Sequence, residues 1–360
     1  MSGHATIVGA GIFGASLAHR LARDGWDVTL YERHEPGHPG AASGGESRLL
    51  RYAHGADPWY TRSARRARDL WRELEVETER ELLVECGIAW FARRQDGWEA
   101  ASEGVMRAEG IAVERLAPDA GHELFPSFEA AELEFILWEP EAGVLRASEA
   151  TRATVEAAER AGVRLIHEVV APGSVEADVV VWACGAWLAA LFDLPIRVTK
   201  QDTLYFAAEG WPSPPLPAWV DYDRAIYGHG ELDQLGVKVA PDAEGPPFDP
   251  EHDERLVSPE TERSARTYLA ERFPALADAP LSGGTVCQYA LTADTNFVIA
   301  RHPAREHEWI LGGGSGHGFK HGPALAEYAA RVVTGEEEPD LRFGLGPRER
   351  GPSLRTAGTT

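Results

Sequence analysis

Three glycines and one acid near the N-terminus form the pattern with the clearest chemistry. Gly9, Gly11 and Gly14 separate a short apolar run from a segment with helical periodicity, and Glu32 ends the next apolar run. In such a unit the glycines allow a tight turn, close approach of a pyrophosphate and close packing of the helix. The helix N-terminus offers N–H groups to the phosphates, and the acid accepts hydrogen bonds from a ribose. The pattern predicts a bound adenine dinucleotide, either FAD or NAD.

A second glycine-rich stretch, GGGSGHGFK at residues 312–320, lies between a predicted strand and a predicted helix. Glycines let the backbone lie against a flat ring, and N–H donors there stabilise the negative charge that a flavin gains when it accepts a hydride. A simple nicotinamide enzyme has no use for such a segment, so the stretch favours FAD over NAD.

Composition limits the class of protein. The chain of 360 residues is long enough for two cores, and its formal net charge of −22 argues against nucleic acid or an anionic membrane as a partner. The cysteines Cys86, Cys184 and Cys287 form no CxxC pair and the histidines show no metal-ligand spacing, so we expect no disulfide framework and no metal. Without a signal segment or an apolar run of membrane-spanning length, we expect a cytoplasmic protein.

The elements that must position these residues indicate an α/β fold with two domains. A buried strand is expected within 178–185, and period-two alternation over 196–240 predicts antiparallel strands of a separate sheet. We therefore expect a Rossmann-type FAD-binding domain with a discontinuous second domain built on an antiparallel sheet. The expected division is 1–80, 145–195 and 285–345 for FAD binding, 81–144 and 196–284 for substrate and oxygen, and 346–360 as a polar tail.

Several local expectations go with this division. Arg48 and Arg51, three residues apart, should lie at the start of a helix, and Ser148 is a candidate N-cap for a helix over 147–161. The strand that contains Cys287 should return to the first domain, and the polar chain after Gly335 should be partly disordered.

The segments VGAGIFGAS, GGESRLLRYAHG, GVKVAPD, VCQYALTAD and GGGSGHGFK resemble, in order and spacing, those of the monomeric sarcosine oxidase (N-methyl amino acid oxidase) family. These are covalent flavoprotein amine oxidases of the D-amino-acid-oxidase superfamily. The resemblance runs from residue 8 to about residue 338. SGHGFK and SRLLR are its specific signatures, whereas GxGxxG is shared with many dehydrogenases.

The resemblance implies that the Cys287 sulfur bonds to the 8-methyl group of FAD, although a lone cysteine is otherwise most often a small buried hydrophobe. Arg48 should face the flavin or an acid such as Glu46. The implied FAD-binding residues are Gly9, Gly11, Ile12, Phe13, Gly14, Glu32, Arg33, Ser43, Arg48, Cys287, Gly314, Gly316, His317, Gly318, Phe319 and Lys320.

The same resemblance implies the substrate site. Arg51 and Lys320 would hold the substrate carboxylate, which a planar guanidinium and an ammonium suit chemically. Lys238 would activate O2, and Tyr227 and Tyr289 would line the pocket. The alternatives are an ordinary surface arginine, a solvated strand lysine and two core aromatics.

Two positions depart from the family pattern. Ser43 and Gly44 stand where the family has a histidine pair by the flavin, and Asp242 replaces a usual pocket histidine. Asp242 either recognises a donor on the substrate's substituent or pairs with a nearby arginine. An acid in that pocket argues against sarcosine itself as the substrate.

The sequence thus predicts a monomeric FAD-dependent oxidase of a secondary or N-substituted amino acid. The carbon next to nitrogen would give hydride to flavin N5, the imine would hydrolyse, and O2 would become H2O2. One alternative is a larger substrate, such as a cyclic imino acid or a fructosyl amino acid. Another is a dinucleotide-binding protein without oxidase activity.

Overall fold

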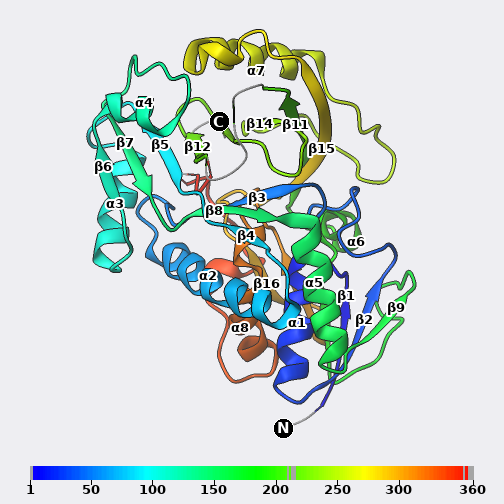
Figure 1. The fold of residues 1–360 in the computed structure, drawn as a ribbon. Coiled ribbons are helices and arrows are strands. Elements are labelled where there is room, and N and C mark those ends of the chain that lie inside the picture. Colours follow the sequence, from blue (N-terminus) through cyan, green and yellow to red (C-terminus); the bar gives the residue numbers. More distant parts are fainter. Residues whose placement is uncertain (1–2, 209–210, 212–215, 352, 356–360) are drawn as a thin grey trace.

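The computed structural model describes residues 3–208, 211, 216–351 and 353–355. Within these residues the chain forms a six-stranded sheet and an eight-stranded sheet, and a small three-stranded sheet lies in the middle of the molecule (Figure 1). The expected α/β class with a second, largely antiparallel sheet is confirmed.

The six-stranded sheet has five parallel strands and one antiparallel edge strand, β16. Apolar side chains cover both of its faces: Ile7 and Val181 belong to one core cluster, and Val8 and Val180 to another. In order across the sheet, the strands are β16 (Val298–His302), β17 (Arg305–Gly312), β10 (Val179–Trp182), β1 (His4–Val8), β2 (Asp27–Glu32) and β9 (Arg164–His167).

Four helices pack beside this sheet. Helix α1 (Ile12–Arg23) contacts α5 (Ala147–Arg160) and α8 (Gly322–Val333), and α2 (Pro58–Thr78) packs against α5 and α8. The start of α2 is encoded locally, because the Asp57 carboxylate accepts a hydrogen bond from Trp59 N and Pro58 occupies the first turn.

The eight-stranded sheet is antiparallel except for the β12–β5 pair, and α7 (Pro259–Arg272) covers one face of it through Tyr268 and Leu269. Its strands, in order, are β15 (Leu281–Leu291), β11 (Arg197–Phe206), β14 (Val237–Pro241), β13 (Ile226–His229), β12 (Ala218–Asp221), β5 (Ile88–Ala92), β7 (Phe135–Glu139) and β6 (Glu114–Leu116). The other strands and α-helices are β3 (Ser47–Leu50), β8 (Gly143–Arg146), β4 (Leu83–Val84), α3 (Trp98–Ala108), α4 (Gly121–Leu124) and α6 (Leu188–Phe192).

Two local expectations about the first domain are wrong. Arg48 lies in β3 and Arg51 directly follows this strand, so neither begins a helix. Residues 47–50 pair with β8, and this long-range contact decides their conformation. Ser148 does not cap α5, because its hydroxyl donates to the carbonyls of Gly37 and Gly45 instead.

One expectation about the C-terminal third is also wrong. Cys287 lies on β15, which pairs with β11 in the eight-stranded sheet and not with the first domain. After Gly335, the side chains of Phe343, Leu354 and Arg355 are buried. Residues 352 and 356–360 of the expected tail lie outside the described residues, so its partial disorder stays a prediction. No helix in the described part of the chain is long and apolar enough to cross a membrane.

The glycine turn after β1 generates the first prediction. Gly9 has φ +103°, and a Cβ on Gly14 would lie 1.9 Å from the Gly9 carbonyl oxygen. The Gly14→Val substitution should therefore lower the free energy of unfolding by at least about 1–3 kcal/mol, measured by urea unfolding. The control is Gly104→Ala in α3, where a new Cβ meets nothing within 4 Å. It should leave stability unchanged or raise it by up to about 1 kcal/mol. Equal effects of both changes would contradict the contact.

Candidate active site

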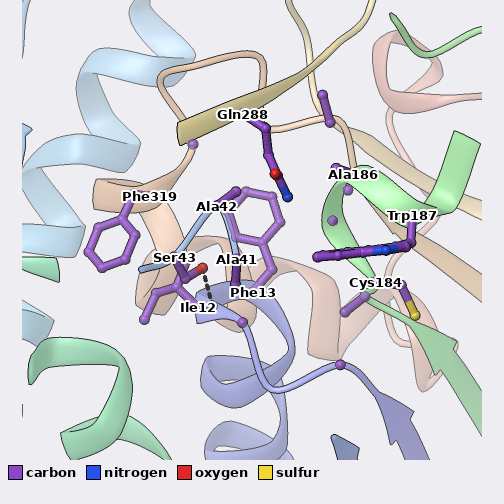
Figure 2. Close-up of a pocket in the computed structure, with 18 of the residues that line it drawn as sticks. Ile12, Phe13, Ala41, Ala42, Ser43, Cys184, Ala186, Trp187, Gln288 and Phe319 are labelled. Carbon is purple, nitrogen blue, oxygen red and sulfur yellow. Dashed lines mark hydrogen bonds between the residues drawn. The ribbon is translucent and has the colours of Figure 1, made fainter. Parts of the chain in front are cut away.

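A cavity of about 490 Å³ runs from the glycine turn after β1 to the edge of the eight-stranded sheet. With the exceptions of Gly14 and Lys238, every residue predicted for cofactor or substrate binding lines it. Segments that are far apart in the sequence therefore meet in one site. Figure 2 shows part of this wall, with Cys184, Ala186 and Trp187 on one side and Phe319 on the other.

The predicted dinucleotide end is already organised by hydrogen bonds. Glu32 lies at the end of β2, and its two carboxylate oxygens accept from Ala10 N (2.8 Å) and His34 N (3.0 Å). The Ser43 hydroxyl accepts from Ile12 N at the start of α1, at 2.9 Å (Figure 2). The acid therefore fixes the turn after β1, and Ser43 ties the loop after β2 to the helix.

Arg33 and Trp187 add a wall to this end of the cavity. The Arg33 guanidinium lies 4.6 Å from the centre of the Trp187 ring and pairs with Glu251 at 2.6 Å. Trp187 and Glu251 both line the cavity. Neither carried a sequence signal, because their approach depends on α6 and on a loop of the second sheet.

Residues 312–320 connect β17 to α8, as the sequence predicts. Gly316 has φ +75°, and a Cβ on Gly318 would lie 2.7 Å from the Phe13 ring and 2.9 Å from the Gly314 Cα. Larger residues at these positions would clash with their neighbours. The glycines thus leave an open backbone surface on the cavity wall.

Cys287 reaches the cavity from the eight-stranded sheet. Its sulfur accepts a hydrogen bond from Arg48 Nη2 at 3.2 Å, and the same nitrogen donates to the carbonyls of Ala42 and Gly44. Arg48 does not pair with Glu46, so that part of the expectation is wrong. Its guanidinium instead places a fixed positive charge beside the sulfur.

Arg51 and Lys320 are buried cations in the same cavity. Arg51 donates to the carbonyls of Ala53 and Leu354, and Lys320 Nζ donates to the His317 carbonyl at 2.8 Å. Among the described residues neither forms a salt bridge. Burial lowers the pKa of Arg51 to about 10, and burial together with the nearby Arg51 charge lowers the pKa of Lys320 well below its usual value. The charges of the buried acids Glu139 and Asp242 oppose these shifts, but no carboxylate of the described residues contacts either cation, so an anionic ligand could fill that role.

Lys238 lies behind the cavity wall. Its ammonium donates to the Ser47 hydroxyl (2.9 Å) and carbonyl (3.1 Å) and lies 5.5 Å from the centre of the Tyr227 ring. Burial, and then the charge of Arg48, lower the pKa of Lys238 to about 7. Burial also raises the pKa of nearby Glu46 to about 7. The solvated-lysine alternative is wrong, because Lys238 is 1% exposed.

Asp242 faces the cavity and pairs with an arginine, the second of the two arrangements considered for it. That arginine is Arg355, whose Nη1 lies 2.8 Å from Asp242 Oδ1. Tyr289 donates to the same carboxylate oxygen at 2.8 Å. Burial raises the pKa of Asp242, and the charge of Arg355 opposes that shift. Sequence reasoning missed Arg355 because it follows a long polar stretch without periodicity.

Three histidines also converge beneath the glycine stretch, although their sequence positions suggested no cluster. One ring nitrogen each of His54, His317 and His321 lies within 4.8 Å of the others. Burial, and then the charge of Lys320, lower the pKa of all three imidazoles. The nearby cations Lys320 and Arg51 also oppose a divalent metal ion there, so the cluster is best described as neutral packing.

Comparisons with known proteins agree with this geometry. Monomeric sarcosine oxidase of Bacillus sp. (strain B-0618) is 28% identical, over 93% of each chain. N-methyl-L-tryptophan oxidase of Salmonella dublin is 27% identical, over 92% of this chain and 94% of its own. The crystal structure of L-proline dehydrogenase from P. horikoshii superposes with a TM-score of 0.81, at 22% identity over 95% of this chain and 96% of its own.

These similarities confirm the resemblance found in the sequence. The profile described as "FAD dependent oxidoreductase" matches residues 4–332. Because that match covers most of the chain, the protein belongs to the DAO family of FAD-dependent oxidoreductases.

Proposed function

We propose that this protein is a sarcosine-oxidase-like oxidase of secondary or N-substituted amino acids. One observation carries the proposal. A single cavity joins the dinucleotide turn after β1, the glycine stretch 312–320, the Cys287 sulfur and two buried cations that form no salt bridge with any described residue. The first two features suit FAD, and the last suits a substrate carboxylate.

The residues present fit FAD. The turn at Gly9 and Gly11 has no side chain in the way of a pyrophosphate, and Glu32 lies beside it. The open backbone of residues 312–318 suits a flat ring. When bound, FAD would supply two-electron chemistry, in which hydride from the carbon next to nitrogen is accepted and its electrons pass on to O2 to give H2O2.

Arg51 and Lys320 give the substrate its orientation in this proposal. A carboxylate placed between them would satisfy both charges and reverse the effect of burial on each pKa. Tyr227 and Tyr289 line the same space and would bound the substituents of the amine. The amine must be neutral to lose hydride, and a wall with buried cations favours its neutral form.

The direct test is the spectrum of the purified protein and a screen for peroxide release. A yellow protein that yields H2O2 with N-methyl, cyclic or glycated amino acids is the expected result. The uncharged amide of the best substrate should have a kcat/KM about tenfold or more below that of the acid itself, because the amide cannot form the charge-assisted hydrogen bonds to Arg51 and Lys320. Absence of flavin, or peroxide release at equal rates from acid and amide, would contradict the proposal.

We further propose that Cys287 holds FAD covalently. One S–H and one C–H bond would be replaced by a bond between Sγ and the 8-methyl carbon, and O2 would take up the two electrons and two protons to give H2O2. After acid denaturation the yellow colour should stay with the wild-type protein and leave with Cys287→Ser. The matched control is Cys184→Ser, which should keep the colour bound. Complete loss of colour from the wild type would contradict the bond.

Lys238 is proposed to assist the reaction with O2. Lys238→Met should slow reoxidation by about 10²-fold or more, as removal of one fixed charge-stabilising group does elsewhere, while anaerobic reduction by substrate changes little. Lys200→Met, on β11, is the control.

The pH dependence follows from the same lysine. Its ammonium is charged below a pKa of about 7 and neutral above it. The groups around it are Glu46, Arg48, Cys287, Ser47, Tyr227 and His229. The reoxidation rate of the wild type should therefore fall as pH rises through about 7, and stopped-flow traces of Lys238→Met should lack this step. If Lys238→Met slowed reduction by substrate and reoxidation by O2 to the same extent, Lys238 would be assigned to substrate binding or folding instead.

A further inference from the structure

The C-terminal segment at residues 353–355 forms part of the cavity wall. Tyr222 donates to the Ser353 carbonyl at 3.0 Å, and Leu354 N donates to the Thr295 hydroxyl at 3.2 Å. Arg51 Nη2 donates to the Leu354 carbonyl at 2.8 Å. In Figure 1 this red end of the described chain lies close to β12. The segment is therefore anchored to the turn after β12, to the loop between β15 and β16, and to a predicted substrate-binding residue.

Arg355 is held in a fixed orientation inside the cavity. Its side chain is 3% exposed, its Nη1 bonds to the carboxylate and carbonyl of Asp242, and its guanidinium lies 4.8 Å from the centre of the Tyr289 ring. Its Cδ lies 2.5 Å from the position that a Cβ on Gly316 would take. Glycine at 316 thus leaves the space that the arginine occupies.

One edge of this guanidinium is unused. Nε and Nη2 share one side of the planar group, and neither has a hydrogen-bond partner among the described residues. Buried donors without a partner destabilise a protein, so a partner is expected. The parallel N–H groups of this edge match the two oxygens of a carboxylate. The nearby acids are committed elsewhere: Asp242 to Nη1, and Glu139 to Tyr52 N and Trp90 Nε1.

We propose that the Nε–Nη2 edge of Arg355 is a carboxylate-binding site of the substrate chamber, supplied by the C-terminal segment. The inference deepens the proposed function and rests on it for the identity of the chamber. The carboxylate is either the one next to the reacting amine or a second one on the substituent. Both are bound by the same two parallel hydrogen bonds, and small acids distinguish them.

The test is isothermal titration of the flavin-loaded protein with sodium acetate, sodium succinate and acetamide. Arg355→Gln should weaken acetate binding by about tenfold or more if the edge holds the carboxylate next to the amine. If it holds a second carboxylate, only succinate should lose this affinity. Acetamide should be unaffected in both cases. Unchanged binding of both acids to Arg355→Gln, or an equal loss for acetamide, would overturn the proposal.

Two further variants separate binding from folding. Arg350→Gln removes the same charge from an exposed residue that precedes this segment and should bind like the wild type. Arg355→Lys keeps the charge beside Asp242 but offers no paired edge, so it should recover only part of the affinity; wild-type binding would overturn the two-bond arrangement. Melting curves identify any variant that has lost its fold. The titration does not depend on turnover, so the carboxylate site and the oxidase proposal can fail separately.

Discussion

Burial of positive charge without an equal number of anions is the constraint that organises this site. Arg51, Lys320 and Arg355 all lie inside the protein, and Asp242 is the one acid that pairs with any of them among the described residues. Charges removed from water require partners, and hydrogen bonds to backbone carbonyls compensate only part of the cost of desolvation. The carbonyls of Ala53, His317 and Leu354 hold the cations in place, while an anionic ligand is still required to balance their charge. Uncompensated buried charge lowers stability, so binding of an anion there would stabilise the protein.

The three cations come from separate parts of the chain. Arg51 follows β3, Lys320 precedes α8, and Arg355 belongs to the C-terminal segment. Arg51 is held by the carbonyls of Ala53 and Leu354, Lys320 by the His317 carbonyl, and Arg355 by Asp242. The three charges therefore do not depend on one loop, and the geometry of the chamber is fixed by the packing of both large sheets.

Sequence reasoning identified the residues that belong to local motifs. The glycine turn, Glu32 and the stretch 312–320 could be predicted because the backbone conformation of each motif depends on residues that are adjacent in the sequence. Residues 47–50 could not be placed, since their strand conformation comes from pairing with β8, far along the chain. Cys287 was assigned to the wrong sheet because apolar β-strands of the two sheets have the same composition. Arg355 could not be predicted at all, because its burial depends on contacts with Asp242, Tyr289 and the space at Gly316.

The position of Cys287 means that a ligand bound in the cavity couples the unfolding of the two large sheets. Cys287 lies on the edge strand of the eight-stranded sheet, whereas the turn after β1 and the stretch 312–320 belong to the six-stranded sheet. A ligand that fills the cavity touches both, so separation of the sheets would expose or release it. Mass action then links the two cores, since a ligand that binds only the intact state stabilises it by an amount that grows with the logarithm of the ligand concentration relative to its Kd. The loaded protein would melt as one cooperative unit even where the empty chain opens in parts.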